Sequence, residues 1–292
     1  MSILVIGGTG VVGKELLQEL SKRGATVRCL TRMASNIGNF PLGVQGIVGD
    51  LEKLSAIKQA MEGIEKVFLL TPLSQNETKL GLNAVKAAKS AGVKKMVYMS
   101  AYMPQGSATV PHYATKIPVE KALKESGLDF TILQPNNFYQ NDFWCKAALM
   151  LYNVYPQPIG NLGTNRIDAH DVAYAAANVL SQDIFKGETY TLHGPEVSTG
   201  DSVAKTYEQY IHKTIHYGGD DLQNWAKQAQ HMMPTWMVSD FKTMYQFMQT
   251  QGMVADQQMI TLQQQILQKD LIRFGDFVKN IIPLWKKEYN IP

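Results

Sequence analysis

One segment near the N-terminus constrains the fold of this chain more than any other. The apolar run Ile3–Ile6 leads directly into glycines at Gly7, Gly10 and Gly13, and a helical pattern follows. In a strand–turn–helix of this kind, Gly7 allows the tight turn, Gly10 leaves room for a ligand beside the backbone, and Gly13 lets the helix pack closely on the strand. The amides at the helix start then face an anion, which the helix dipole also attracts. The segment predicts a pyrophosphate-binding turn formed by Gly7, Thr9, Gly10, Val11, Val12 and Gly13.

The first half of the chain alternates strand-like apolar runs with segments of helical periodicity. The predicted strands are Ile3–Ile6, Thr26–Leu30, Gln45–Val48, Lys66–Leu70, Met96–Met99 and Asp129–Leu133. The predicted helices are Val11–Ser21, Leu54–Met61, Glu77–Ser90 and Tyr113–Glu125, with left-handed caps expected at Gly24, Gly63, Gly92 and Gly127. This alternation is typical of an α/β fold with a doubly wound parallel sheet of the Rossmann type.

The pattern changes after Pro135. A helix is predicted at Asp168–Leu180 and a strand at Glu188–Leu192, and from about Ser198 the chain consists of helical segments joined by short turns. We therefore expect residues 1–135 to form an NAD(P)-binding Rossmann-type domain, to which 166–195 returns. Residues 136–165 and 196–292 should form a smaller, mostly helical lobe on the substrate side.

Composition excludes several classes of protein. A net charge of +3, scattered along 292 residues, gives no concentrated basic face, so we expect no nucleic acid partner. The two cysteines, Cys29 and Cys145, lack metal-ligand spacing, so we expect no metal site and interpret them as structural thiols of a reducing compartment. No apolar run approaches the roughly 20 residues that cross a bilayer, and no leader precedes the first strand, which together favour a cytoplasmic protein with no membrane partner.

The end of the second strand indicates the cofactor. NAD-binding domains usually place an Asp or Glu there for the ribose hydroxyls, but no acidic residue lies between Glu19 and Asp50. Arg32 follows this strand instead, where its guanidinium could pair with a 2′-phosphate. The sequence therefore predicts NADP(H) in preference to NAD(H), with a solvated surface arginine as the alternative.

Other candidate cofactor contacts lie at the carboxyl ends of the remaining strands, where doubly wound folds bind ligands. Asp50 could accept from the adenine amino group, or it could cap the following helix. The Asn136–Phe138 segment could close over a nicotinamide, with ordinary loop chemistry as an equal alternative. The segment His231–Met237 could wall an apolar pocket, although packing within the lobe is favoured. The full set at these strand ends is Asp50, Leu51, Thr71, Pro72, Ser100, Asn136 and Phe138.

Several of these segments together resemble the NmrA-like branch of the atypical short-chain dehydrogenase/reductases. The likeness covers most of the chain and rests on the glycine turn, Thr31-Arg32, Gly49-Asp50-Leu51 and the run His112-Tyr113-Ala114-Thr115-Lys116. It implies a Rossmann domain with a small C-terminal lobe. Members of this branch include NADPH-dependent reductases, quinone reductases and proteins that sense the nicotinamide pool without turnover. The resemblance also implies that Lys116 binds the nicotinamide ribose.

The chain departs from the usual short-chain dehydrogenase pattern at the catalytic position. Those enzymes carry Tyr-x-x-x-Lys, which puts both side chains on one helix face, but here that spacing belongs to His112 and Lys116. Tyr113 is three residues before the lysine. His112 or Tyr113 would therefore donate the proton that accompanies hydride transfer. A purely structural alternative pairs Lys116 with Glu120 four residues later.

The leading hypothesis is an NADPH-dependent oxidoreductase that acts on a small carbonyl, quinone or conjugated alkene, an apolar or quinone-like substrate. The alternative is a non-catalytic redox sensor that signals through a regulatory protein partner, which the displaced tyrosine favours. A homodimer is also compatible with the sequence. An epimerase acting on sugar nucleotides is disfavoured, because such enzymes use the intact Tyr-x-x-x-Lys pair.

Overall fold

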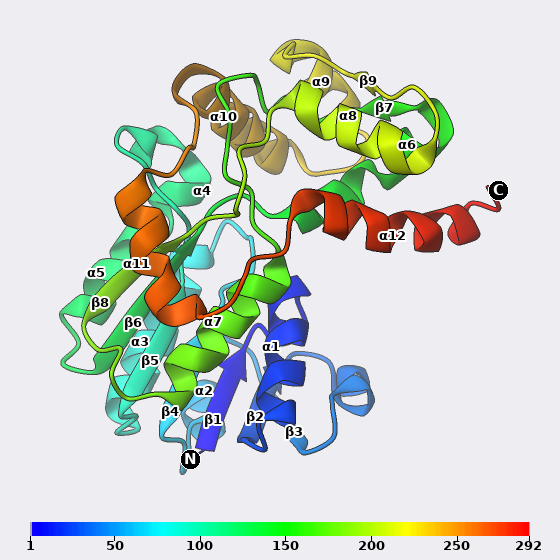
Figure 1. Cartoon of the computed structure of the whole chain (residues 1–292). Helices are drawn as coiled ribbons and strands as arrows, with labels where there is room; N and C mark the ends of the chain where they lie inside the picture. Colours follow the sequence, from blue (N-terminus) through cyan, green and yellow to red (C-terminus); the bar gives the residue numbers. More distant parts are fainter. Residues whose placement is uncertain (1, 292) are drawn as a thin grey trace.

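The computed structural model describes residues 2–291, and its centre is one sheet of seven parallel strands (Figure 1). The strand order is β3-β2-β1-β4-β5-β6-β8. The strands are β1 (Ser2–Ile6), β2 (Thr26–Thr31), β3 (Val44–Val48), β4 (Lys66–Leu69), β5 (Lys95–Met99), β6 (Asp129–Pro135) and β8 (Glu188–Leu192). The order runs outward in both directions from β1 and β4. The connections leaving these two strands therefore diverge and open a crevice at their carboxyl ends.

Helices cover both faces of the sheet because apolar side chains of the strands alternate between two core layers. Ile3 and Val5 of β1 point into one core layer, and Leu4 and Ile6 point into the other. The first layer is covered by α1 (Val11–Lys22), α7 (Ala169–Ser181) and α11 (Gln257–Leu267), and the second by α2 (Leu54–Ala60), α3 (Glu77–Ser90) and α5 (Ile117–Lys124).

The α11 helix lies in a segment that the sequence assigned to the lobe. Its Ile266 and Leu267 are buried in the same core layer as α1 and α7, and the helix packs against α7 and β8 (Figure 1). The chain thus returns to the sheet a second time near its C-terminus.

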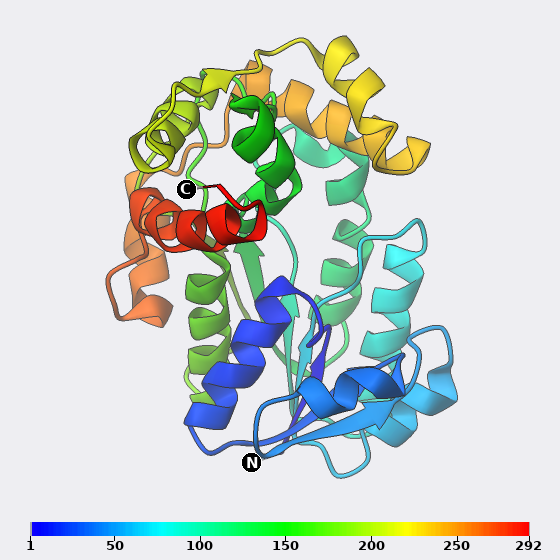
Figure 2. The same cartoon turned by 90° about the vertical axis from the view of Figure 1, so that its right-hand side faces the viewer.

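Most of the remaining elements form a helical lobe over the carboxyl edge of the sheet (Figure 2). The lobe has its own apolar core, rich in Tyr, Phe and Met side chains. Its elements are η3 (Tyr139–Cys145), α6 (Lys146–Tyr152), β7 (Val154–Tyr155), α8 (Gly200–Ile211), β9 (His216–Tyr217), α9 (Leu222–Ala229), α10 (Thr235–Gln251) and α12 (Phe274–Glu288). The parallel β7–β9 pair was not predicted, since two residues per strand are too few to give a pattern.

The predicted doubly wound α/β fold is confirmed, with each predicted strand present within one or two residues at its ends. Gly24, Gly63, Gly92 and Gly127 all have positive φ, as expected for left-handed helix caps. Short 3₁₀ turns occur at η1 (Ala34–Asn39) and η2 (Ser107–Thr109). Within residues 2–291, no helix combines the length and apolar character needed to span a bilayer.

The predicted single helix Tyr113–Glu125 is wrong. The structure has a short helix, α4 (Pro111–Ala114), and then α5 from Ile117. Pro118 has no N–H to donate to the carbonyl four residues back, and the Lys116 N–H bonds instead to the Tyr113 carbonyl, three residues back. The turn between α4 and α5 therefore carries the one lysine of the predicted catalytic run.

Candidate active site

A single long cavity of about 860 Å³ lies along the carboxyl ends of the strands, between the sheet and the lobe. Its lower end is lined by the glycine turn and the end of β2. Its upper end is lined by aromatic and methionine side chains of η3, α9 and α10. The crevice predicted from the strand order is therefore continuous with an apolar chamber under the lobe.

The glycine turn has the geometry that its sequence predicts. Gly7 has φ +88°, and a Cβ there would lie 2.6 Å from the Leu70 carbonyl oxygen. A Cβ at Gly13 would overlap the Gly7 carbonyl oxygen, so the start of α1 can approach the turn only without a side chain. Gly10 caps α1 and has no contact closer than 3.5 Å at its Cβ position.

Gly8 has a packing role that the sequence analysis missed. A Cβ at Gly8 would overlap the sulfur of Cys29 on β2. Cys29 is itself fully buried, and burial raises the pKa of its thiol to about 12. The second glycine of the Gly7-Gly8 pair therefore serves the packing of β1 on β2, which agrees with the interpretation of Cys29 as a structural thiol.

The predicted site residues gather around this cavity. Gly13 does not line the cavity, but its missing Cβ lets the start of α1 pack against the turn. Those that line it are Gly7, Thr9, Gly10, Val11, Val12, Arg32, Asp50, Leu51, Thr71, Pro72, Ser100, His112, Tyr113, Lys116, Asn136 and Phe138.

Arg32 and Asp50 stand at the end of the cavity next to β2 and β3. The Arg32 side chain is exposed and has no hydrogen bond or ion pair within the described part of the chain. The Asp50 carboxylate accepts from the Glu52 N–H at 2.9 Å. The alternative in which Asp50 caps the following helix is wrong, because α2 begins at Leu54 and its cap position is Lys53.

Thr71 and Ser100 line the cavity, but each hydroxyl is engaged by a buried carboxylate. Thr71 Oγ1 donates to Glu77 Oε1 at 2.8 Å. Ser100 Oγ donates to Glu120 Oε1 at 2.6 Å, and Gln134 donates to the same oxygen at 2.8 Å. Glu120 therefore does not pair with Lys116, and that structural alternative is wrong.

Lys116 pairs instead with Glu77, the first residue of α3. Its Nζ donates to Glu77 Oε1 at 2.5 Å, and both side chains are almost fully buried. The second carboxylate oxygen, Oε2, lies 3.1 Å from the Thr115 hydroxyl and 4.0 Å from His112 Nδ1. The start of α3 and the turn between α4 and α5 thus meet at one buried carboxylate on the cavity wall.

The two candidate proton donors beside Lys116 differ in their surroundings, since His112 faces the Glu77 carboxylate and Tyr113 is buried in the apolar core of the lobe. Burial, reinforced by the charge of Lys116, lowers the pKa of His112 to about 3, so its imidazole is neutral at neutral pH. Tyr113 is buried, its hydroxyl lies 3.5 Å from the Met253 sulfur, and burial raises its pKa above the usual value. Among residues 2–291, neither the His112 ring nor the Tyr113 hydroxyl forms a hydrogen bond with Lys116.

A carboxylate from the lobe holds the segment that carries these residues. Asp240 of α10 accepts from the His112 backbone N–H at 2.9 Å and so caps α4 from outside. Burial raises the pKa of Asp240. The lobe therefore fixes the start of the His112–Lys116 run.

Asn136 and Phe138 lie where the sheet meets the lobe. The Asn136 amide donates to the Met253 carbonyl at 2.8 Å and lies 3.2 Å from His193 Nδ1, and its oxygen accepts from Thr164 at 3.1 Å. The Asn136 side chain thus holds the sheet and the lobe together through these contacts. Phe138 is partly buried and presents its ring to the first core layer as well as to the cavity.

The upper end of the cavity is apolar. Met232 and Met233 line it, so the favoured interpretation of His231–Met237 as packing alone is incomplete. Met233 does both, since it also packs against Ala226, Ala229 and Val238. Sequence reasoning missed the other walls, which are Trp144, Pro156, Trp225, Phe241, Met244, Tyr245 and Met253.

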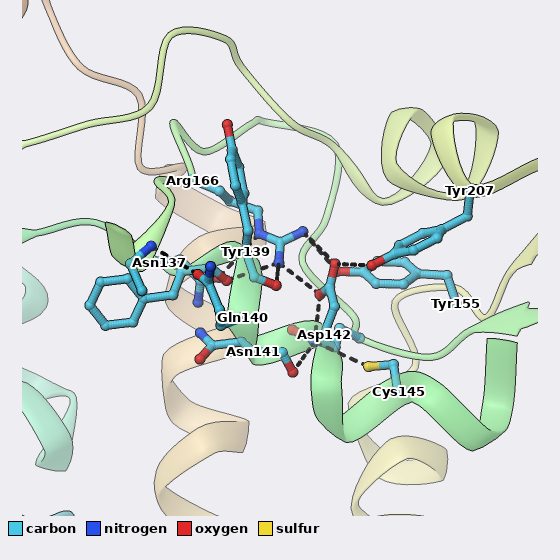
Figure 3. A network of polar contacts seen from close by, with 12 residues as sticks. Asn137, Tyr139, Gln140, Asn141, Asp142, Cys145, Tyr155, Arg166 and Tyr207 are labelled. Carbon is cyan, nitrogen blue, oxygen red and sulfur yellow. Dashed lines mark hydrogen bonds and ion pairs between the residues drawn. The ribbon is translucent and has the colours of Figure 1, made fainter. Parts of the chain in front are cut away.

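A buried polar network anchors the floor of this upper end. Arg166 and Asp142 are both fully buried and form an ion pair, with Arg166 Nη2 2.7 Å from Asp142 Oδ1. Figure 3 shows the Asp142 carboxylate between Arg166 and the hydroxyls of Tyr155 and Tyr207, and Tyr207 donates to it at 2.9 Å. The network fixes η3, whose Asn141 and Cys145 line the cavity.

Gln157 links this network to the wall of the cavity. Its Nε2 lies 3.0 Å from Asp142 Oδ1, and its Oε1 accepts from the Tyr245 hydroxyl at 3.2 Å. Burial raises the pKa of Cys145, which therefore stays a thiol. Gln157 and Tyr245 are 88 positions apart, so no local pattern could have predicted this contact. Glu77 did have a signal, as an acidic residue starting a helix after a strand end.

The chain matches known proteins over most of its length. The model of the NmrA-like family matches residues 1–271. Over 233 residues the sequence is 30% identical to the NAD(P)H azoreductase of Xenophilus azovorans, a match that covers 78% of this chain and 79% of that protein.

Solved structures share the fold. The NADPH complex of the NADPH-dependent quinone oxidoreductase QOR2 from Escherichia coli has a TM-score of 0.86 at 21% identity, covering 96% of this chain and 99% of that one. NmrA, a negative transcriptional regulator in complex with NADP, has a TM-score of 0.81 at 17% identity, covering 99% and 98%. At these identities the structural likeness establishes the fold alone.

Proposed function

This chain belongs to the NmrA-like family, and on that basis we propose that it is an NADPH-dependent oxidoreductase that reduces a small, uncharged acceptor. The observation that carries the proposal is the continuity of the cavity. One pocket joins the glycine turn, Lys116 and an apolar chamber, as a hydride transfer from cofactor to acceptor requires.

The residues at the lower end fit a dinucleotide. The first-turn amides of α1 have no helical acceptors, and Gly10, Val11 and Val12 face the cavity. The first turn of α1 has no acidic residue that would repel a phosphate. A Cβ at Gly7 would collide with the Leu70 carbonyl, and a Cβ at Gly13 would collide with the Gly7 carbonyl, so the turn keeps its shape only with glycine at both positions. We propose that this turn holds the pyrophosphate, with Asp50 and Leu51 beside the adenine.

Arg32 supports NADP(H) in preference to NAD(H). Its guanidinium is exposed at the end of β2, lines the cavity and has no protein partner among residues 2–291. Five N–H donors in a planar fork match the oxygens of a 2′-phosphate. Within residues 2–291, β2 is followed directly by Arg32 and Met33, and not by a carboxylate that could hold a free 2′-hydroxyl.

Lys116 is the side chain best placed to bind the cofactor ribose and to protonate the reduced acceptor. Bound NADPH supplies the hydride. An ammonium has three N–H donors, and within the described residues Lys116 uses one of them, on Glu77. Two donors remain for a ribose hydroxyl and for the acceptor atom that receives the electron pair. A proton from Lys116 or Tyr113 then completes the two-electron reduction, and solvent restores it. His112 is a neutral imidazole with no acidic proton to give.

The upper end of the cavity favours an apolar, quinone-like or carbonyl substrate, or a conjugated alkene. Its walls are aromatic rings and thioethers, and the charged residues that line the cavity lie at the lower end or at the junction. A charged acceptor would lose its hydration there without a counter-charge. The relative from X. azovorans is named an azoreductase, and an azo group is a conjugated acceptor of this kind.

The non-catalytic sensor remains the second candidate, favoured by one observation. Tyr113 is three residues from Lys116 and is bonded to a thioether, so the usual tyrosine donor is missing. In a sensor, a regulatory protein partner would detect occupancy of the cavity. The known regulator NmrA shares the fold and binds NADP.

We also propose that the NAD(P)-binding domain comprises 1–135 with 166–195, and that 136–165 and 196–292 form the substrate lobe, α11 apart. The two free, buried cysteines support a reducing, cytoplasmic location.

NADPH oxidation at 340 nm against a panel of quinones, azo dyes and aldehydes tests the function. We expect turnover of at least one neutral aromatic acceptor, and none of an anionic analogue of the same size. Tight NADPH binding without turnover of any acceptor would favour the sensor instead.

A further inference from the structure

The Glu77 carboxylate is an unusual feature of the cavity wall. It is 1% exposed, at the first position of α3, where it meets Lys116, Thr71, Thr115 and His112. A carboxylate loses its hydration on burial, so it needs partners that replace water. The N-terminal end of α3 adds favourable partial charge.

The pair is not needed to join α3 to the segment that follows α4. The Thr78 hydroxyl already donates to the Thr115 carbonyl at 2.7 Å. Further along, Gly81 of α3 lies so close to Val119 of α5 that a Cβ at Gly81 would fall 2.6 Å from the Val119 methyl group. Because buried ion pairs are often no more stabilising than apolar packing, stability alone does not explain Glu77.

The position of the pair in the cavity gives the second argument. Glu77, Lys116 and His112 all line the cavity between its glycine-turn end and its apolar end. A lysine ammonium sits on a flexible four-carbon stem and takes up one position only if something holds it. Glu77 Oε1 accepts from the Lys116 ammonium, and the Thr71 hydroxyl donates to the same carboxylate oxygen.

We propose that Glu77 is a positioning residue for the reaction, which holds the Lys116 ammonium at the junction of the two ends of the cavity. The inference rests on the proposed function, because it gives that reaction its ordered lysine. Glu77 itself donates no proton and touches no substrate. It leaves two Lys116 N–H groups directed to ligands, and it supplies the negative charge that keeps the ammonium at this place.

A double-mutant cycle tests whether Glu77 acts through Lys116. The variants are Glu77→Gln, Lys116→Met and the combination, and the readouts are the NADPH Kd by tryptophan fluorescence and kcat with 1,4-benzoquinone. Misplacement of a positioned group typically costs up to about 100-fold in rate. We expect Glu77→Gln to lower kcat about 10- to 100-fold and to raise the NADPH Kd about 3- to 10-fold in the wild-type background. In the Lys116→Met background it should change neither quantity more than about 2-fold.

The control is Asp171→Asn. Asp171 is also a fully buried carboxylate paired with a lysine, Lys269, at 2.5 Å, but it does not line the cavity. Its substitution should lower the melting temperature and leave the NADPH Kd unchanged. If Glu77→Gln does not fold, Glu77→Asp keeps the charge one methylene further from Lys116, and a smaller loss that again vanishes in the Lys116→Met background is expected.

Equal losses in both backgrounds would overturn the proposal, since Glu77 would then act on the structure and not through the lysine. Unchanged Kd and kcat in Glu77→Gln would overturn it as well. The proposed function fails separately, if the wild-type protein oxidises NADPH with no acceptor. In that case the Kd arm of the cycle still decides the role of Glu77.

Discussion

The two ends of the cavity are built in different ways. The glycine-turn end is made by consecutive residues, and its shape depends on backbone approaches at Gly7 and Gly13. The apolar end is assembled from side chains that are far apart in the sequence, such as Asp142 with Arg166 and Gln157 with Tyr245. A local site tolerates almost no change at its few backbone positions, whereas an assembled site depends on many contacts of moderate strength.

The largest expected effect is on the assembled end. Asp142→Asn would leave the fully buried Arg166 without its counter-charge. Removal of one partner of a buried ion pair typically costs about 3–5 kcal/mol of stability. We therefore expect the free energy of unfolding, measured with urea at neutral pH, to fall by about this amount. Asp183→Asn is the control, because Asp183 pairs with Lys66 but is 76% exposed. It should cost less than about 1 kcal/mol. Equal losses in the two variants would show that the network does not hold the lobe.

The next effect is on the local end. Gly13→Val would place a side chain on the Gly7 carbonyl and displace the start of α1 from the turn. We expect the NADPH Kd to rise about 100-fold, equivalent to about 2.7 kcal/mol. Gly275→Val in α12, where the nearest atom would be 3.4 Å from the new Cβ, is the matched control and should leave the Kd unchanged. A Gly13→Val protein that binds NADPH normally would contradict a local, backbone-built site.

The same difference between the two ends determines how much of the site the sequence could predict. The strand, the glycines and the helix of the turn are contiguous in the sequence. Their spacing therefore predicted both the fold and the lower end of the cavity. The break between α4 and α5 was missed because Pro118 acts through a lost hydrogen bond that helical periodicity does not register. Glu77, Asp142 and Met253 were missed because their partners come from other elements, which only the tertiary fold brings together.

Acid should weaken the contact between the sheet and the lobe, where His193 Nδ1 lies 3.2 Å from the Asn136 amide nitrogen. Burial lowers the pKa of His193 from 6.5 to about 4. Between these values the unfolded chain binds a proton that the folded protein does not, so stability is complete above about pH 6.5 and falls as the pH drops toward 4. We expect His193→Gln to reduce the loss between about pH 7 and pH 4.5 by about 2 kcal/mol in urea unfolding. His112 contributes in the same direction and remains in the variant. An unchanged pH dependence in His193→Gln would show that His193 is not buried as a neutral group.

The smallest effect tests the cofactor preference. Arg32→Ala should lower the ratio of NADPH to NADH affinity about 10-fold, through loss of a charge-assisted contact of about 1.5 kcal/mol. Arg28→Ala is the control, because Arg28 donates to the carbonyls of Ala60 and Glu62 and does not line the cavity. If Arg32→Ala keeps the wild-type ratio of NADPH to NADH affinity, as Arg28→Ala should, the preference for NADP(H) has another origin.

The most direct test of the account is to measure NADPH binding and turnover together in Gly13→Val and Lys116→Met. The account predicts that Gly13→Val loses binding, whereas Lys116→Met still binds NADPH within about 10-fold and loses about 100-fold or more in kcat. Full turnover in Lys116→Met, at saturating NADPH, would contradict the assignment of cofactor binding to the glycine turn and of the chemical step to Lys116.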